Sequence, residues 1–190
     1  MPPQFTENGE PRRHPLEILF QAPGWEILTA IEHGPRSRTD VKGKLAEFYL
    51  NRHMELMRDR LKISELIWSD ATGEPDFLIE IEGYRYRIEC KNVRSGKSVY
   101  RDGYKVEIQK TRNAIAGGPS RGYRVDDFDI LAACLFNQTG EWKYLFSACG
   151  RLERRLQYPD YLVIMQRVPF TASGFWRENL EEAIGDFKLL

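Results

Sequence analysis

The chain has 190 residues, of which 42% are hydrophobic and 29% are charged, as in an ordinary globular protein. A chain of this length buries about 70% of its unfolded surface on folding, so its core needs neither disulfides nor a structural metal. Lysine plus arginine and aspartate plus glutamate number 28 each, and no apolar run approaches the roughly 20 residues that cross a bilayer, which excludes a transmembrane protein.

Residues 1–38 are predicted to form an N-terminal arm with short helices, ahead of a core over residues 39–190, in a chain that is one compact domain overall. The arm is rich in proline up to Pro15. Apolar residues favour helices at Leu16–Phe20 and Trp25–His33, separated by a Pro-Gly pair. The chain start lacks a secretory signal, and three scattered cysteines form no CxxC pair, so a cytoplasmic location is expected.

A long helix is predicted next, capped by Thr39 or Asp40 and running to about Arg58. Its apolar residues recur at approximately helical spacing, so one face of the helix should lie against a sheet. These residues are Val41, Leu45, Phe48, Tyr49, Met54, Leu56 and Met57.

Strands dominate the middle of the chain. After a strand near Ile63–Trp68, the pattern predicts a hairpin formed by Phe77–Glu82 and Tyr84–Val93, with a turn at Gly83. The following segment, to about residue 124, contains glycines and serines that suit loops.

A second hairpin is predicted from Phe128–Phe136 and Trp142–Phe146, and Tyr161–Val168 supplies a further strand. Near the C-terminus an amphipathic helix is predicted, with Ser173 as its cap. The apolar residues of that helix are Trp176, Leu180, Ile184 and Phe187.

Positive charge is concentrated between Tyr84 and Arg124, where eleven basic residues outnumber three acidic ones by eight. Such an excess, interleaved with tyrosines, is typical of a polyanion site. The alternative is a solvated face whose neutralising acids lie elsewhere in the fold, and the charge count alone does not decide between the two. The residues predicted to contact nucleic acid are Arg36, Arg38, Arg94, Lys97, Arg101, Lys105, Lys110, Arg112, Arg121 and Arg124.

Three residues of the first hairpin can carry chemistry. Alternation along its second strand places Glu89 and Lys91 on one face and Cys90 on the other, and Asp76 begins the first strand. Two carboxylates suit a hard cation such as Mg²⁺, and a lysine beside them can orient a nucleophile or neutralise developing charge. We expect a bend or bulge near Asp76, because a regular hairpin would offset Asp76 from Glu89.

With Pro75-Asp76 followed by Glu89-Cys90-Lys91, the sequence resembles the PD-(D/E)xK nuclease superfamily of restriction endonuclease-like proteins. The resemblance covers roughly residues 40–146. It implies an α/β fold with a mixed central sheet flanked by helices, double-stranded DNA as substrate, frequent homodimerisation, and Mg²⁺ as cofactor with Mn²⁺ able to substitute. It also implies a catalytic set of Asp76, Glu89, Lys91 and Glu47, and metal ligands Asp76, Glu89, Cys90 and Glu47.

Two further positions lie where some branches of that superfamily place another active-site residue, namely Gln109 and Lys110, and neither is assigned. A competing set also exists: Asp129 with the triplet Glu141-Trp142-Lys143 again spans a hairpin. There the carboxylates should be several residues of strand rise apart, so the first set is preferred.

Each predicted residue also has a simpler explanation. Glu89 and Lys91 could form a surface ion pair of little energetic weight, Asp76 could be a turn residue, and Glu47 could face solvent on its helix. The three histidines lack metal-ligand spacing, which argues against zinc.

The sequence therefore predicts a Mg²⁺-dependent DNA endonuclease, of restriction type. The alternatives are a non-catalytic nucleic-acid-binding module of the same fold and a structure-specific repair or RNA nuclease, since one metal site can handle either backbone.

Overall fold

The computed structural model describes residues 13–69, 71, 73–97, 99–110 and 122–190. The chain divides into two compact units, an N-terminal unit of residues 1–42 and a C-terminal unit of residues 43–190. Among the helices that the structure describes, none is both long and apolar enough to cross a membrane.

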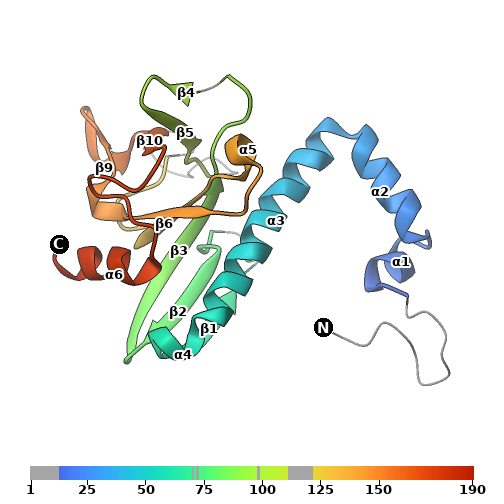
Figure 1. The fold of residues 1–190 in the computed structure, drawn as a ribbon, viewed down its shortest axis with the longest axis horizontal. Coiled ribbons are helices and arrows are strands. Elements are labelled where there is room, and N and C mark those ends of the chain that lie inside the picture. Colours follow the sequence, from blue (N-terminus) through green and yellow to red (C-terminus); the bar gives the residue numbers. More distant parts are fainter. Residues whose placement is uncertain (1–12, 70, 72, 98, 111–121) are drawn as a thin grey trace. The chain divides into compact units, whose positions relative to one another are not determined.

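The N-terminal unit contains α1 (Pro15–Leu19), α2 (Gly24–His33) and the start of α3 (Pro35–Leu56) (Figure 1). Glu17 joins the first two helices, because its carboxylate accepts hydrogen bonds from the backbone N–H of His14 at 2.6 Å and of Gly24 at 2.7 Å. The two short helices were predicted within one or two residues. The predicted cap of the long helix at Thr39 or Asp40 is wrong, because the helix already begins at Pro35, and proline suits a first helical position.

In the C-terminal unit, the rest of α3 packs its buried side chains against a five-stranded sheet. The strand order is β1-β2-β3-β6-β7, and β3 pairs with β6 in parallel while the other pairs are antiparallel. This confirms the predicted α/β fold with a mixed central sheet. The strands are β1 (Ile63–Trp68), β2 (Phe77–Ile81), β3 (Tyr84–Asn92), β6 (Ile130–Cys134) and β7 (Tyr144–Ala148).

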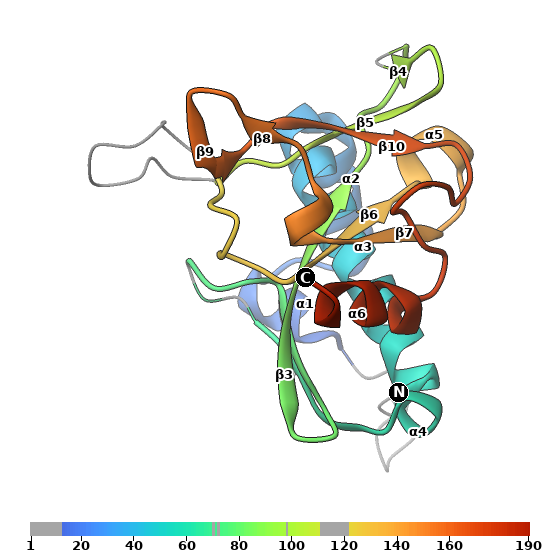
Figure 2. The same ribbon diagram turned by 90° about the vertical axis from the view of Figure 1, so that its left-hand side faces the viewer.

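Two hydrophobic cores lie on the two faces of this sheet. The first is shared with α3 and with α6 (Leu180–Lys188). The second is shared with a smaller sheet of order β10-β5-β4, made of β4 (Val99–Tyr100), β5 (Gly103–Glu107) and β10 (Met165–Pro169), and Figure 2 shows these strands crossing above the main sheet. Residues of β6 alternate between the two cores: Ile130, Ala132 and Cys134 face the helices, and Leu131 and Ala133 face the small sheet.

The short elements complete the unit. They are α4 (Arg58–Leu61), α5 (Phe136–Thr139), the 3-10 turn η1 (Cys149–Arg151), β8 (Arg154–Arg155) and β9 (Tyr158–Leu162).

The C-terminal third differs from the sequence prediction in two respects. The predicted strand Tyr161–Val168 is two strands, β9 and β10, that belong to different sheets. The predicted cap at Ser173 is wrong, because the helix begins only after Asn179. Trp176, expected on that helix, is instead buried in the second core.

Candidate active site

The turn between β2 and β3 sets the geometry of the site. Glu82 and Gly83 both have positive φ, 52° and 82°, as a two-residue type I′ hairpin turn requires. Ile81 pairs with Tyr84, and the register continues without a shift to Phe77 and Ile88. One further step places Asp76 opposite Glu89. The expected offset was therefore wrong, and the two strands need no bulge to bring these residues together.

Asp76 lies just outside β2 and is held from both sides. Its carboxylate Oδ2 accepts a hydrogen bond of 2.8 Å from the backbone N–H of Cys90. Its carbonyl oxygen accepts one of 2.9 Å from the backbone N–H of Ser69. These two hydrogen bonds fix Asp76 between β1 and β3. On the β3 side, the carboxylate of Asp76, and not its carbonyl oxygen, accepts the backbone hydrogen bond.

Glu89 is the buried centre of the cluster, with only 3% of its surface exposed. Its Oε1 accepts hydrogen bonds from the Lys91 ammonium and from the Tyr123 hydroxyl. Lys91 Nζ also lies 3.7 Å from Asp76 Oδ2. The structure therefore brings Asp76, Glu89 and Lys91 together as the sequence predicts, and it adds Tyr123.

Tyr123 is a site residue that the sequence does not single out, since it is only one of the tyrosines interleaved with the basic residues between Tyr84 and Arg124. It comes 34 residues after Glu89 and is positioned by its ring, which meets Phe128 edge-on at 5.4 Å between centroids. The Lys110 ammonium lies 5.5 Å from the centre of the same ring. No local motif marks Tyr123, because its contact depends on the chain returning to β3.

Burial dominates the electrostatics of this cluster. Burial raises the pKa of Glu89, Asp76 raises it further, and Lys91 opposes the shift. Burial would lower the pKa of Lys91, but the charges of Glu89 and Asp76 outweigh it and raise that pKa. Burial and the neighbouring Glu89 raise the pKa of Tyr123. Lys91 therefore stays charged and Tyr123 stays a hydrogen-bond donor at neutral pH.

The donor set of this cluster fits Mg²⁺. That ion is usually bound through one or two carboxylates, with waters and substrate phosphate oxygens completing its shell. Asp76 and Glu89 supply two carboxylates. Within the part of the chain that the structure describes, no three His, Cys, Asp or Glu side chains gather into a metal-holding group. Two carboxylates would leave the other positions around the ion to waters and substrate oxygens.

Two other predicted ligands make different contacts. Glu47, on α3, accepts hydrogen bonds of 2.8 Å from Lys44 Nζ and 2.9 Å from Trp68 Nε1, and no contact joins it to Asp76 or Glu89 in the described part of the chain. Cys90 belongs to the helix-side core, and burial raises the pKa of its thiol well above the ordinary value. Its side chain thus lies on the opposite face of β3 from Glu89 and Lys91.

The two unassigned positions differ in their surroundings. Gln109 donates a hydrogen bond to Glu107. Lys110 forms an ion pair of 2.7 Å with Asp127, in addition to its contact with Tyr123. Lys110 is therefore a neighbour of the site through Tyr123.

The competing carboxylate set is not assembled. Asp129 is buried against Arg87 on β3, with 2.8 Å from Arg87 Nη2 to Oδ1 and 2.8 Å from the Arg87 backbone N–H to Oδ2. Glu141 is exposed near the far end of the hairpin and pairs with Lys143. The preference for Asp76 over Asp129 agrees with this arrangement.

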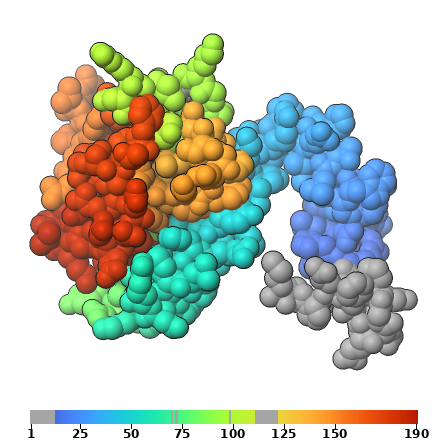
Figure 3. Space-filling view, viewed as in Figure 1, coloured from blue at the N-terminus to red at the C-terminus, as the bar shows by residue number. Residues whose placement is uncertain are grey.

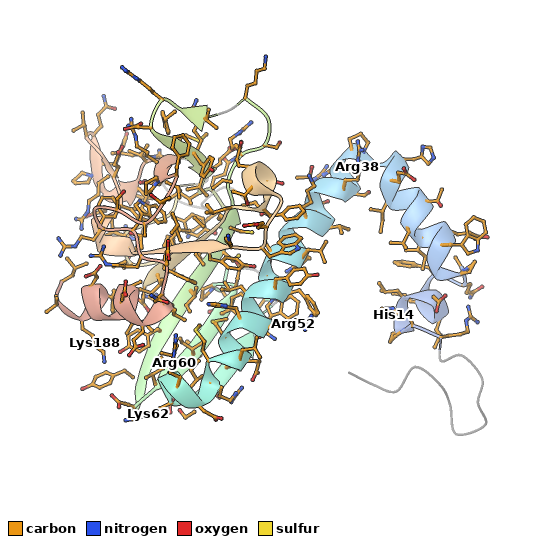
Figure 4. The ribbon with its side chains drawn as sticks, in the orientation of Figure 1. His14, Arg38, Arg52, Arg60, Lys62 and Lys188 are labelled. Carbon is orange, nitrogen blue, oxygen red and sulfur yellow. The ribbon has the colours of Figure 1, made fainter. Side chains whose placement is uncertain are left out.

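The predicted nucleic-acid contacts fall into four groups. Arg94 pairs with Glu107, Lys110 with Asp127, and Arg124 with Asp126. Lys97, Arg101 and Lys105 lie on or beside the β4–β5 hairpin, and Arg36 and Arg38 are exposed in the first turns of α3, where Figure 4 labels Arg38. Arg112 and Arg121 lie outside the described residues.

Comparison with known proteins gives one result. No family model and no curated protein matches the chain. A solved structure similar to it is that of a bacterial homing endonuclease, with 16% identity, a TM-score of 0.44, and coverage of 77% of this chain and 86% of that chain. At this level of similarity, the chemistry of the chain has to follow from its own residues.

Proposed function

We propose that this protein is a Mg²⁺-dependent DNA endonuclease of restriction type. The observation that carries the proposal is the convergence of Asp76, Glu89 and Lys91, in which one ammonium contacts two carboxylates beside a buried strand end. A structural ion pair rarely needs a second carboxylate at a buried position, because like charges are costly there. A bound cation would balance the two carboxylates, and a phosphate would bind the cation and the ammonium, so a functional site explains this cluster better than a structural ion pair does.

Each side chain then has a defined task. Asp76 and Glu89 would hold Mg²⁺, which supplies Lewis acidity and lowers the pKa of a bound water. The Lys91 ammonium is placed to orient the attacking water and to stabilise negative charge on the phosphate in the transition state. Tyr123 keeps one oxygen of Glu89 directed by its hydrogen bond. The step is hydrolysis: the water oxygen loses a proton and bonds to phosphorus, one P–O ester bond breaks, and the leaving sugar oxygen takes up a proton from solvent.

Duplex DNA is the proposed substrate, and a homodimer the proposed assembly. The basic residues that follow β3 supply the sequence-independent attraction to a phosphate backbone. Two chains, each with one Asp76-Glu89-Lys91 cluster, would allow both strands of a duplex to be cut in one encounter.

Cleavage of supercoiled plasmid tests the proposal. Wild-type protein should convert it to nicked and linear forms with Mg²⁺ and leave it intact in EDTA. Lys91→Ala should lower the cleavage rate about a hundredfold or more, since a group that stabilises transition-state charge is lost, while DNA binding stays nearly unchanged. Single-stranded RNA of matched length serves as a second substrate, and faster cleavage of it would replace DNA in the proposal.

Lys143→Ala is the matched control. Lys143 also ends an acid-x-lysine triplet on a hairpin, but its ion pair with Glu141 is exposed. Its replacement should leave the cleavage rate at the wild-type value. Wild-type cleavage by Lys91→Ala, or no Mg²⁺-dependent cleavage by the unaltered protein, contradicts the proposal.

A further inference from the structure

The hairpin formed by β4 and β5 lies in a region that the sequence predicted as loops. Its strands pair through Val99 with Tyr104 and Tyr100 with Gly103, and β5 pairs along its full length with β10. Gly103 fits because any Cβ there would lie 2.5 Å from the carbonyl oxygen of Val168. The hairpin is therefore the outer edge of a three-stranded sheet, and its strands β4 and β5 are called the ribbon below.

The base of the ribbon is joined directly to the catalytic strand. Immediately after β3, Val93 bridges to Val106, and the backbone N–H of Arg94 donates to the carbonyl oxygen of Lys105 at 2.7 Å. From the other side, Asn137 donates to the carbonyl oxygen of Val93 at 2.9 Å. Lys91 lies two residues before this junction, so the position of the ribbon is fixed relative to the proposed active site.

The ribbon carries a cluster of cations organised around one aromatic ring. The Lys105 ammonium lies 4.8 Å from the centre of the Tyr100 ring, and the guanidinium of Arg167, on β10, lies 4.6 Å from it. Asp102 holds Arg167 through a contact of 2.7 Å to Oδ2. These three contacts order the end of the hairpin. They leave it positively charged, because the cluster contains one acid, Asp102, and four cations, namely Lys97, Arg101, Lys105 and Arg167.

Two of these cations are available to a partner. Lys97 and Arg101 are exposed, and within the described ranges no hydrogen bond or ion pair engages either side chain. The other predicted contacts near the site, Arg94, Lys110 and Arg124, are paired with acids. In Figure 3 the lime-green segment that contains the hairpin projects beyond the surrounding surface of its unit.

We propose that the turn of the β4–β5 hairpin lies in the major groove of duplex DNA, with Lys97 on phosphate and Arg101 on the edge of a guanine. The proposal rests on the proposed nuclease function and names the element that selects its substrate. Arginine pairs with the major-groove edge of guanine through two hydrogen bonds, and Arg101 lies in the turn that follows the last paired residue of β4. An acidic peptide would be attracted by the same cations, but it would not need a projecting ribbon fixed beside a phosphodiester site.

Four variants test the proposal: Lys97→Ala, Arg101→Ala, Arg101→Lys and the control Lys188→Ala. Lys188 also lies over tyrosine rings, 5.5 Å from the centre of Tyr84 and 5.9 Å from that of Tyr86, and Figure 4 shows it well away from the hairpin in the same unit. Duplex affinity is measured in EDTA at several salt concentrations. The ends of plasmid fragments cut with Mg²⁺ are then sequenced.

Lys97→Ala should weaken binding to every duplex and reduce the slope of log affinity against log salt by about one. Arg101→Lys should keep the slope, because the charge remains, and lower the preference for guanine at one position at least fivefold, because lysine lacks the planar pair of donors. Arg101→Ala should lose that preference too. Lys188→Ala should match wild type in affinity, salt slope and base preference, and the Lys97 and Arg101 variants should melt at the wild-type temperature because the replaced side chains are exposed.

Two outcomes separate this inference from the proposed function. If wild type cleaves but Lys97→Ala and Arg101→Ala bind and cut like Lys188→Ala, the hairpin does not contact DNA and the inference is overturned. If wild type does not cleave but both variants weaken duplex binding, the endonuclease proposal fails and the hairpin contact is supported.

Discussion

Two hairpins of the main sheet offer similar residues for a metal site, but they present them differently. In β2–β3, a two-residue turn places Asp76 opposite Glu89, and Lys91 contacts both carboxylates. In β6–β7, nine residues separate the last paired positions, Cys134 and Tyr144. Asp129 precedes one end of that ladder and Glu141 lies beyond the other, at least about 17 Å apart at the rise of an extended strand.

The comparison teaches that the connection decides whether two acids on neighbouring strands can meet. After a two-residue turn, residues that are equally far from the turn on the two strands pair with each other. Two acids at such positions therefore face each other. A long connection removes that symmetry. The second hairpin then uses its acid for structure, because Asp129 satisfies the backbone N–H and the guanidinium of Arg87.

The sharpest test of this difference removes the negative charge of each aspartate in turn. Asp76→Asn keeps an oxygen for the hydrogen bond from Cys90 but removes a metal-binding charge, so we expect cleavage to fall about a thousandfold and Mg²⁺ affinity at least tenfold. Asp129→Asn should leave cleavage unchanged and lower the free energy of unfolding by about 1–2 kcal/mol, since it loses a charged hydrogen-bond partner of Arg87.

The measurements are plasmid cleavage, Mg²⁺ titration by calorimetry and urea denaturation for both variants. Loss of cleavage by Asp129→Asn with wild-type cleavage by Asp76→Asn would reverse the assignment of the two hairpins.

Tyr123 marks a second difference, because β6–β7 has no equivalent hydroxyl directed at a carboxylate among the described residues. Tyr123→Phe removes the hydrogen bond to Glu89 and should lower the cleavage rate at saturating Mg²⁺ about tenfold, equivalent to about 1.4 kcal/mol. The Mg²⁺ concentration for half-maximal rate should rise as well, since the Glu89 oxygen is less well oriented.

Tyr144→Phe is the matched control. The Tyr144 hydroxyl, on β7, donates to the carbonyl oxygen of Ala46 at 2.7 Å, so its loss should lower stability without changing the Mg²⁺ dependence. Equal effects of the two variants on the Mg²⁺ dependence would show that Tyr123 acts only through the fold.

Much of the main sheet could be predicted from the sequence. Alternating apolar residues located β1, β2 and β3 within one residue at each end, because these strands bury one face on a helix. The β4–β5 hairpin could not be found this way, since its first strand has two residues, too few to show a period. Trp176 was misplaced because its burial in the second core comes from a loop and not from a helix.

Part of the site could also be predicted from the alternation of residues along a strand. The acid-x-lysine spacing places Glu89 and Lys91 on one face wherever a strand forms, and the turn at Gly83 completes the set with Asp76. The hydrogen bond of Tyr123 and the pairing of Arg94 with Glu107 depend on segments that return from far along the chain. Residue spacing contains no information on such contacts, so the sequence could not tell paired cations from available ones.

The turn that aligns the first hairpin contains strain that a substitution can remove. Glu82 adopts the left-handed region with φ of 52°, which costs an ordinary residue about 1 kcal/mol and asparagine much less. Glu82→Asn should therefore raise the free energy of unfolding, because the loss of its exposed ion pair with Lys62 costs little. Lys62→Ala removes the same ion pair without relieving the turn, so it should lower stability slightly, and urea denaturation of both variants separates the two effects.

Cleavage should stay at the wild-type rate in Glu82→Asn, because the register that places Asp76 opposite Glu89 is kept. A stability loss in Glu82→Asn as large as in Lys62→Ala would mean that the ion pair, and not the turn conformation, holds this end of the hairpin.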